Sequence, residues 1–68
     1  MLGEYQLAIQ DCNRAIEWDS KLSSAYINRS TSYNKLGNTK QSREDMITSA
    51  KLGNLKAQNA LKKEGIQW

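Results

Sequence analysis

The sequence contains no histidine, no proline and no phenylalanine, and it has a single cysteine among 68 residues. Without histidine the usual zinc-binding sets are missing, and the lone Cys12 cannot form a disulfide within the chain. No stretch approaches the roughly 20 apolar residues of a membrane span, and none resembles a signal peptide. These absences predict a soluble, cytoplasmic protein that needs no metal or other cofactor.

The charge balance is mildly basic. Ten Lys and Arg residues against seven Asp and Glu residues give a net charge of +3. The excess lies toward the C-terminus, at Lys51, Lys56, Lys62 and Lys63. No aromatic residue is interleaved with these lysines and no RNA- or DNA-binding motif occurs, so we expect a solvated face rather than a nucleic-acid site.

A repeat with a period of 34 residues is the strongest pattern in the sequence. Leu2-Gly3 recurs as Leu36-Gly37, and Asp11 recurs as Asp45. The period indicates a repeat protein, a class that binds partners through surfaces. Similar residues form further pairs at the same offset: Ala8 with Ser42, Cys12 with Met46, Ala15 with Ser49, and Trp18 with Leu52.

Four segments with helical periodicity lie between the glycines at positions 3, 37, 53 and 65. The first segment has an apolar stripe at spacings of three and four residues, with a polar side opposite. The stripe comprises Tyr5, Ala8, Ile9, Cys12, Ala15 and Ile16, and the polar side comprises Gln6, Gln10, Asn13, Arg14 and Glu17. In the later segments the expected inward residues are Leu22, Ala25, Tyr26, Ser30, Tyr33 and Leu36, then Met46, Ile47 and Ala50, then Leu55, Ala57, Ala60 and Leu61.

Capping residues predict where the later helices begin and end. Ser20 is the expected N-cap of the second helix, and Asn38, followed three residues later by Gln41, is close to a capping box for the third. The fourth helix is expected to stop at Gly65, with Ile66 making the apolar contact of a glycine C-cap. The loops are short, so neighbouring helices must run antiparallel.

Two stretches resemble the tetratricopeptide repeat family. Leu2-Gly3-Glu4-Tyr5, Ala8-Ile9 and Arg14-Ala15-Ile16-Glu17 resemble the second helix of a repeat, and residues 25–38 resemble the first helix and turn of the next. The resemblance implies an all-α, right-handed αα-hairpin fold of about four antiparallel helices. It divides the chain into the second helix of a first repeat (1–20), a second repeat (21–53), and a capping helix with a tail (54–68).

The second repeat departs from the family pattern. Thr39, Ser42 and Arg43 replace an aromatic, an alanine and an aliphatic residue, a degeneracy that is typical of a terminal repeat whose outer face meets water. Residues 2–3 correspond to the turn between the two helices of a unit. The resemblance therefore implies that the first helix of the first repeat is missing and that Met1 begins a fragment.

The resemblance implies a protein-interaction module that holds an extended peptide or a helix in a concave groove. Asn28, which precedes Arg29, matches the asparagine with which family members that bind chaperone tails hold peptide backbone or carboxylate, since an amide both donates and accepts. The same asparagine occurs in repeats without this role. Motif positions place six residues toward the groove: Ser24, Ile27, Asn28, Thr31, Asn34 and Lys35.

Two other functions stay open. In the first, the chain caps a longer solenoid and has no ligand of its own. In the second, the chain forms a homo-oligomer through an unpartnered face that comprises Tyr5, Ala8, Ile9 and Cys12. We predict that the chain is not an enzyme, because Cys12 lies on an apolar stripe and no phosphate-binding glycine pattern occurs. The expected partners are proteins or peptides, not nucleic acids or membranes.

Several single residues also have expected positions. Trp18 falls at an aliphatic packing position of the family, so we expect it in the core or between repeats. Asp11, Glu44 and Asp45 are expected to be solvent-facing charges. Trp68 is expected to fray unless it folds back on the fourth helix or docks on another chain.

Overall fold

The computed structural model describes residues 2–68, without the side chain of residue 2, and this part of the chain contains no β-strand. Its helices, in chain order, are α1 (Leu2–Trp18), α2 (Ser23–Lys35), α3 (Thr39–Lys51) and α4 (Leu55–Lys63). The four helices predicted from the periodicity are confirmed. The predicted all-α fold class is confirmed with them.

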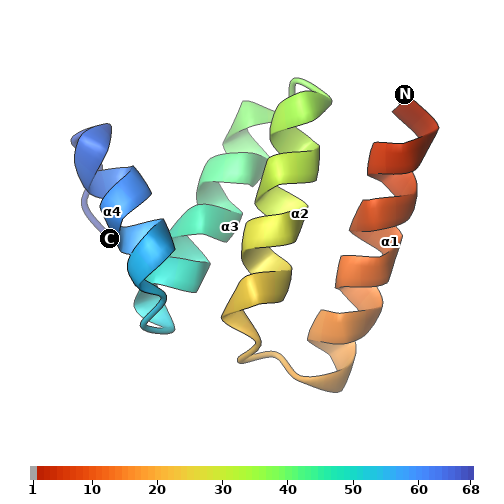
Figure 1. Ribbon diagram of the computed structural model, residues 1–68, viewed down its shortest axis with the longest axis horizontal. Helices are drawn as coiled ribbons and strands as arrows, with labels where there is room; N and C mark the ends of the chain where they lie inside the picture. The colour runs from red at the N-terminus through yellow and green to blue at the C-terminus, as the bar shows by residue number, and fades with distance from the viewer. Residues whose placement is uncertain (1) are drawn as a thin grey trace.

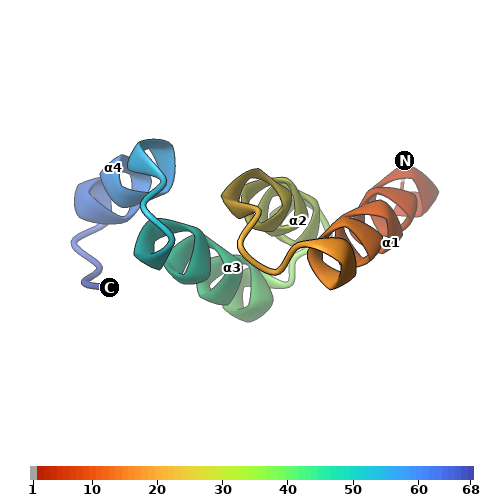
Figure 2. The same cartoon turned by 90° about the horizontal axis from the view of Figure 1, so that it is seen from below.

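Successive helices run antiparallel, side by side along the molecule (Figure 1). Seen from below, α2 and α4 lie on one side of α3, and α1 runs obliquely from their level at its N-terminal end toward the level of α3 at its C-terminal end (Figure 2). The molecule is a thin slab, with extents of 31 × 26 × 15 Å. This staggered row of antiparallel helices is the predicted αα-hairpin repeat.

Left-handed glycines end α2 and α4. Gly37 and Gly65 have φ of +82° and +72°, a region that other L-residues rarely adopt. After α4, the amide of Gly65 donates to the carbonyl of Lys62 (3.0 Å) and the amide of Ile66 to that of Leu61 (2.9 Å). Ile66 also packs against the core. The predicted glycine C-cap with its apolar contact is therefore confirmed.

The predicted N-cap of α2 is wrong. The helix begins at Ser23 rather than directly after Ser20, and its N-cap position is Leu22, which makes no side-chain capping bond. The amide of Leu22 donates to the carbonyl of Asp19 (3.2 Å), so a turn closes before the helix can start. The carbonyl of Ser20 instead accepts a hydrogen bond from the Tyr26 hydroxyl at 3.0 Å.

The capping box predicted for α3 is wrong as well. Asn38 occupies the N-cap position, but its side chain makes no capping bond, so the pairing with Gln41 does not form. Its backbone, at ψ 68°, is outside the extended region in which an N-cap side chain folds back onto the helix. Asn54 is extended, with ψ 115°, and its Oδ1 accepts a hydrogen bond from the amide of Ala57 at 3.0 Å.

The apolar core lies toward the C-terminal half of the slab. Ala50, Ala57 and Leu61 are buried there, and half-buried side chains from α2, α3 and the tail pack against them: Ile27, Met46, Ile47 and Ile66. Between α1 and α2 the buried apolar residues are Cys12 and Ala25. The core is therefore spread along the row of helices rather than gathered at one centre.

Three residues expected to be inward are exposed. Leu22, at the N-cap position of α2, is 37% exposed, so its expected inward position is wrong. Trp18 is 90% exposed, so its expected place in the core is wrong. It is the last residue of α1, where the chain leaves for the 19–22 loop, and its repeat equivalent Leu52 is also exposed at the end of α3. Leu55, expected on the inward stripe of the fourth helix, is 72% exposed because it is the first residue of α4, beside the loop.

Candidate functional site

Small polar side chains join α2 to α3. The hydroxyl of Ser30 donates to the carbonyl of Ser42 at 2.8 Å, and its oxygen lies 2.9 Å from the Ser42 hydroxyl. At the other end of the helix pair, the Ser49 hydroxyl donates to the carbonyl of Ser23 at 3.0 Å. These short side chains let the two helices approach closely while their polar groups stay satisfied.

An ion pair lies between α2 and α3 in the same interface. Arg29 donates from Nε and Nη2 to the two carboxylate oxygens of Asp45, at 2.8 and 2.7 Å. Asp45 is only 5% exposed, so the expectation that it faces solvent is wrong. The hydrogen bond to Asp45 raises the pKa of Arg29 above its ordinary value. Arg29 therefore supplies the positive charge that compensates the buried carboxylate of Asp45.

Arg29 also contacts α1 and two tyrosines of its own helix. Its Nη1 donates to Oδ1 of Asn13 at 2.9 Å, so Asn13, placed by sequence on the polar side of the first helix, in fact faces α2. The guanidinium lies 5.5 and 5.9 Å from the ring centroids of Tyr26 and Tyr33, within cation–π range. One feature of the sequence indicated this network: Arg29 is a charged residue at a position within the stripe of the second helix that is expected to face inward.

The residues predicted to line a groove occupy the open face of α2. Ser24, Asn28, Thr31, Asn34 and Lys35 are exposed. Ile27 is half-buried and packs against the core beneath α4, so it forms one edge of this face rather than its surface. The Thr31 hydroxyl donates to the carbonyl of Ile27 at 3.1 Å. Two hollows flank this open face, one on either side of α2.

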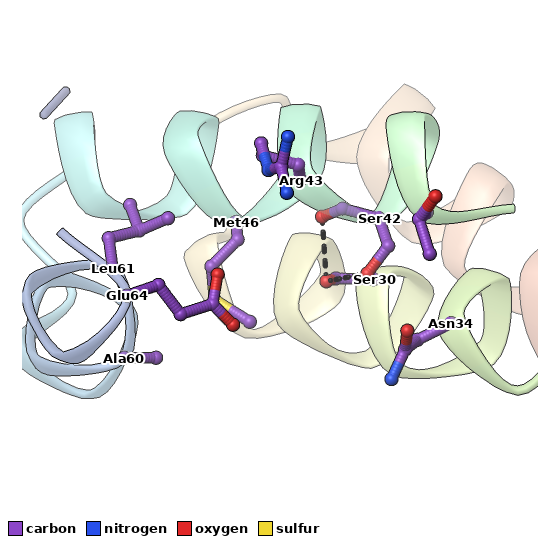
Figure 3. Close-up of a pocket in the computed structure, with 9 residues that line it drawn as sticks. Ser30, Asn34, Ser42, Arg43, Met46, Ala60, Leu61 and Glu64 are labelled. Carbon is purple, nitrogen blue, oxygen red and sulfur yellow. Dashed lines mark hydrogen bonds between the residues drawn. The ribbon is translucent and has the colours of Figure 1, made fainter. Parts of the chain in front are cut away.

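The first hollow, which we call the C-terminal hollow, lies between α2, α3 and α4 and has a volume of about 150 Å³. Figure 3 shows Glu64, the C-cap residue after α4, reaching toward Met46, with Asn34 at the far end. The side chains of Asn34, Arg43 and Glu64 make no hydrogen bond or ion pair within residues 2–68. Its lining residues are Ser30, Asn34, Thr39, Ser42, Arg43, Met46, Ala60, Leu61 and Glu64.

The second hollow, the N-terminal hollow, lies between α1 and α2 and has a volume of about 210 Å³. Asn28 and Ser24 line it, whereas Asn34 lines the C-terminal hollow. The other three predicted groove residues, Ile27, Thr31 and Lys35, line neither hollow. From α1 it is lined by an exposed carboxylate, Asp11, and by the small side chains of Cys12 and Ala15. The remaining lining residues are Leu22 and Ala25.

The predicted self-association face is only partly open. Tyr5, Ala8 and Ile9 are half-buried, and Cys12 is buried at 7% exposure. Burial raises the pKa of the Cys12 thiol, an effect that the charge of Arg29 only partly opposes. The thiol is therefore neutral near pH 7 and acts as a small packing residue rather than a nucleophile.

Two classes of site find no candidate in the part of the chain that the structure describes. No group of three or more Cys, Asp or Glu side chains there could hold a metal ion. None of the helices in residues 2–68 combines the length and the apolar character needed to cross a membrane. The Trp68 ring is 46% exposed and lies beside Lys62 and Ile66 in a shallow surface depression.

A row of antiparallel helices with a 34-residue period in the sequence defines the class of αα-hairpin repeat proteins. The family model of the tetratricopeptide repeat matches residues 2–22. Residues 2–22 are thus similar to a tetratricopeptide repeat, and residues 23–68 continue the row of antiparallel helices beyond the matched range. Comparisons with curated proteins and with solved structures gave no match. Tetratricopeptide repeats generally mediate protein–protein interactions, and most members are scaffolds without catalytic activity.

Proposed function

We propose that this chain is a non-catalytic binding module that holds an extended peptide across the open face of α2. The observation that carries this proposal is the C-terminal hollow, at one edge of that face. It combines an apolar floor at Met46 and Leu61 with polar groups that have no partner within the described residues, at Asn34, Arg43 and Glu64. A concave site with a few free polar groups is the usual form of a ligand site.

Asn34 fits a peptide main chain and the basic residues fit a carboxylate, whereas Glu64 can accept a hydrogen bond from a peptide N–H. The amide of Asn34 can donate to a peptide carbonyl and accept from a peptide N–H. Lys35 and Arg43, both exposed, add positive charge beside it. In this proposal α2 belongs to a second repeat (21–53), preceded by the second helix of a first repeat (1–20) and followed by a capping segment (54–68).

The affinity of one such face is expected to be weak. A single helix offers few contacts, and these must offset the several kcal/mol that association costs. We therefore expect a dissociation constant of about 1 mM for a short peptide.

The test is a titration of the isotope-labelled chain with an acidic pentapeptide that has a free C-terminal carboxylate, followed by NMR. We expect the amide signals of Asn34 and Lys35 to shift, and Asn34→Ala to weaken binding about fivefold, the loss of one or two hydrogen bonds. The matched control is Asn59→Ala, which removes an exposed amide that lines neither hollow. The Asn28→Ala variant tests whether the N-terminal hollow contributes to peptide binding.

A specific observation also favours a second candidate function, in which the C-terminal segment caps a longer solenoid. α4 buries Ala57 and Leu61 against α3 and exposes Lys56, Lys62 and Lys63 on its other side. A lysine-rich outer face is what the last helix of such an array presents to water. If several millimolar of the acidic peptide moves no signal on α2, the capping function is favoured and peptide binding is contradicted.

A further inference from the structure

The two charged residues that line the C-terminal hollow have opposite signs. Arg43 belongs to α3, and Glu64 is the C-cap residue of α4. Neither side chain forms an ion pair within residues 2–68. Because both line one hollow, a ligand that fills it meets a cation on one wall and an anion on another. The ligand that matches the hollow therefore carries charges of both signs.

The size of the hollow suits a single side chain. Its volume of about 150 Å³ is below the roughly 300–1,000 Å³ of sites that take whole small molecules. Small residues on its walls, Ser30, Ser42 and Ala60, keep it open. Its floor is apolar and is formed by Met46 and Leu61. An unbranched aliphatic side chain fits such a space.

The polar groups of the hollow are separated along this floor. Glu64 reaches toward Met46, whereas Asn34 is at the far end (Figure 3). Lys35, which follows Asn34 on α2, is exposed and adds positive charge at that end. A ligand that lies along the floor therefore has an anion at one end and an amide with positive charge near the other.

We propose that the hollow holds the C-terminal lysine of the bound peptide, an inference that rests on the peptide binding proposed above. The lysine stem lies on Met46 and Leu61, and its ammonium group pairs with Glu64. The α-carboxylate of the same residue pairs with Arg43 and accepts a hydrogen bond from the amide of Asn34. A lysine carries both charges in one residue only at the C-terminus of a chain, so the position is terminal.

Lysine matches the hollow better than the other charged side chains do. Its stem packs on apolar surface, and its charge is compact, so a single carboxylate such as Glu64 can pair with it. Arginine has a wider planar head that is best bound at two points, as Arg29 is by Asp45. An acidic side chain would be repelled by Glu64.

The test compares two N-acetylated pentapeptides that differ only in the ammonium group. They are Asp-Ala-Asp-Ala-Lys and Asp-Ala-Asp-Ala-norleucine, both with a free C-terminal carboxylate, and norleucine keeps the apolar stem of lysine without its amine. Each peptide is titrated into the isotope-labelled chain and followed by NMR. We expect the lysine peptide to bind about threefold more tightly, as for an ion pair at a solvent-open site. Its ε protons should show contacts with the methyl group of Met46.

Charge variants decide whether Glu64 is the anion that selects lysine. Glu64→Gln keeps the shape of the side chain, and we expect this variant to bind both peptides equally. The matched control, Glu44→Gln, removes an exposed carboxylate of α3 that lines neither hollow and should keep the threefold preference. Glu64→Lys should prefer a peptide that ends in glutamate. About 0.5 M salt should abolish the preference of the unaltered chain, because salt screens exposed pairs.

Three results would overturn this inference while peptide binding itself stands. They are equal binding of the lysine and norleucine peptides, a threefold preference that survives Glu64→Gln, and contacts of the lysine ε protons away from Met46. If neither peptide moves the amide signals of Asn34 and Lys35 at several millimolar, the peptide-binding function is contradicted, and the lysine site with it. The two failures are therefore distinguishable.

Discussion

Arg29 links three of the four helices through one guanidinium. It donates to Asp45 on α3 and to Asn13 on α1, and it lies against the rings of Tyr26 and Tyr33. The ion pair is mostly removed from water, with 21% of the Arg29 side chain and 8% of the Asp45 side chain exposed. A pair in this setting contributes little net stability by itself, but the loss of one partner leaves the other uncompensated.

The two equivalent aspartates provide a matched prediction. We expect Asp45→Asn to lower the free energy of unfolding by about 2 kcal/mol, because it weakens two charged hydrogen bonds and leaves Arg29 unpaired. Asp11→Asn, at the same repeat position but exposed, should change it by less than about 0.5 kcal/mol. Urea unfolding followed by circular dichroism measures both. Equal effects would contradict the assigned role of the ion pair.

Cys12 gives a prediction about pH. Because its pKa is raised in the folded chain, the folded state keeps the thiol proton at a pH where the unfolded chain has begun to lose it. Its contribution to stability is thus complete below about pH 9 and declines as the pH rises through the folded pKa. We expect urea titrations to show this alkaline decline, and Cys12→Ala to reduce it. If Cys12→Ala showed the same alkaline decline in stability, the decline would come from other titratable groups.

At the scale of the elements, glycine C-caps define where the helices stop. We expect Gly65→Ala to destabilise the chain by about 1 kcal/mol, because its φ of +72° is strained for alanine. An added Cβ meets no atom within 4 Å, so this cost belongs to the backbone alone. Gly3→Ala, inside α1 and equally unobstructed, should leave the melting temperature unchanged or slightly higher. Thermal unfolding of both variants tests the pair.

At the scale of the whole molecule, the core is so small that a single buried residue contributes a large part of the free energy of unfolding. We expect Leu61→Ala to cost about 2–3 kcal/mol, since Leu61 is 2% exposed and packs with Ala50 and Ala57. A domain of this size has little stability in reserve, so the variant should be partly unfolded at 25 °C. Leu55→Ala makes the same change in the same helix at a 72% exposed position and should cost under about 0.5 kcal/mol. Circular dichroism at matched concentrations compares the two.

The elements were predictable to a greater extent than the contacts between them. Apolar periodicity and the glycines at helix ends are local signals, and they located all four helices. The start of α3 was predicted at the right residue, because Asn38 does occupy its N-cap position, but the capping bond does not form since the backbone of Asn38 is not extended. The start of α2 was predicted less well, because its N-cap position is Leu22 rather than Ser20. The backbone conformation of a loop depends on both helices that it joins.

The candidate site was predicted in part. The exposure of Ser24, Asn28, Thr31 and Lys35 follows from the polar face of a helix. Whether Asn28 and Asn34 share one groove does not follow, because each lines a hollow whose other wall comes from a different helix. The free polar groups at Arg43 and Glu64 come from α3 and from the C-cap of α4, and only packing brings them beside α2.

The sequence by itself determined the helices, their antiparallel order and the 34-residue period, because these depend on residue spacing and on short loops. The tertiary structure alone decided which of two equivalent aspartates is buried. Asp11 and Asp45 have the same place in the repeat, yet α2 lies over one and no described element lies over the other. Burial depends on the neighbour that a helix acquires on folding, and spacing along the chain does not reveal which flank remains open.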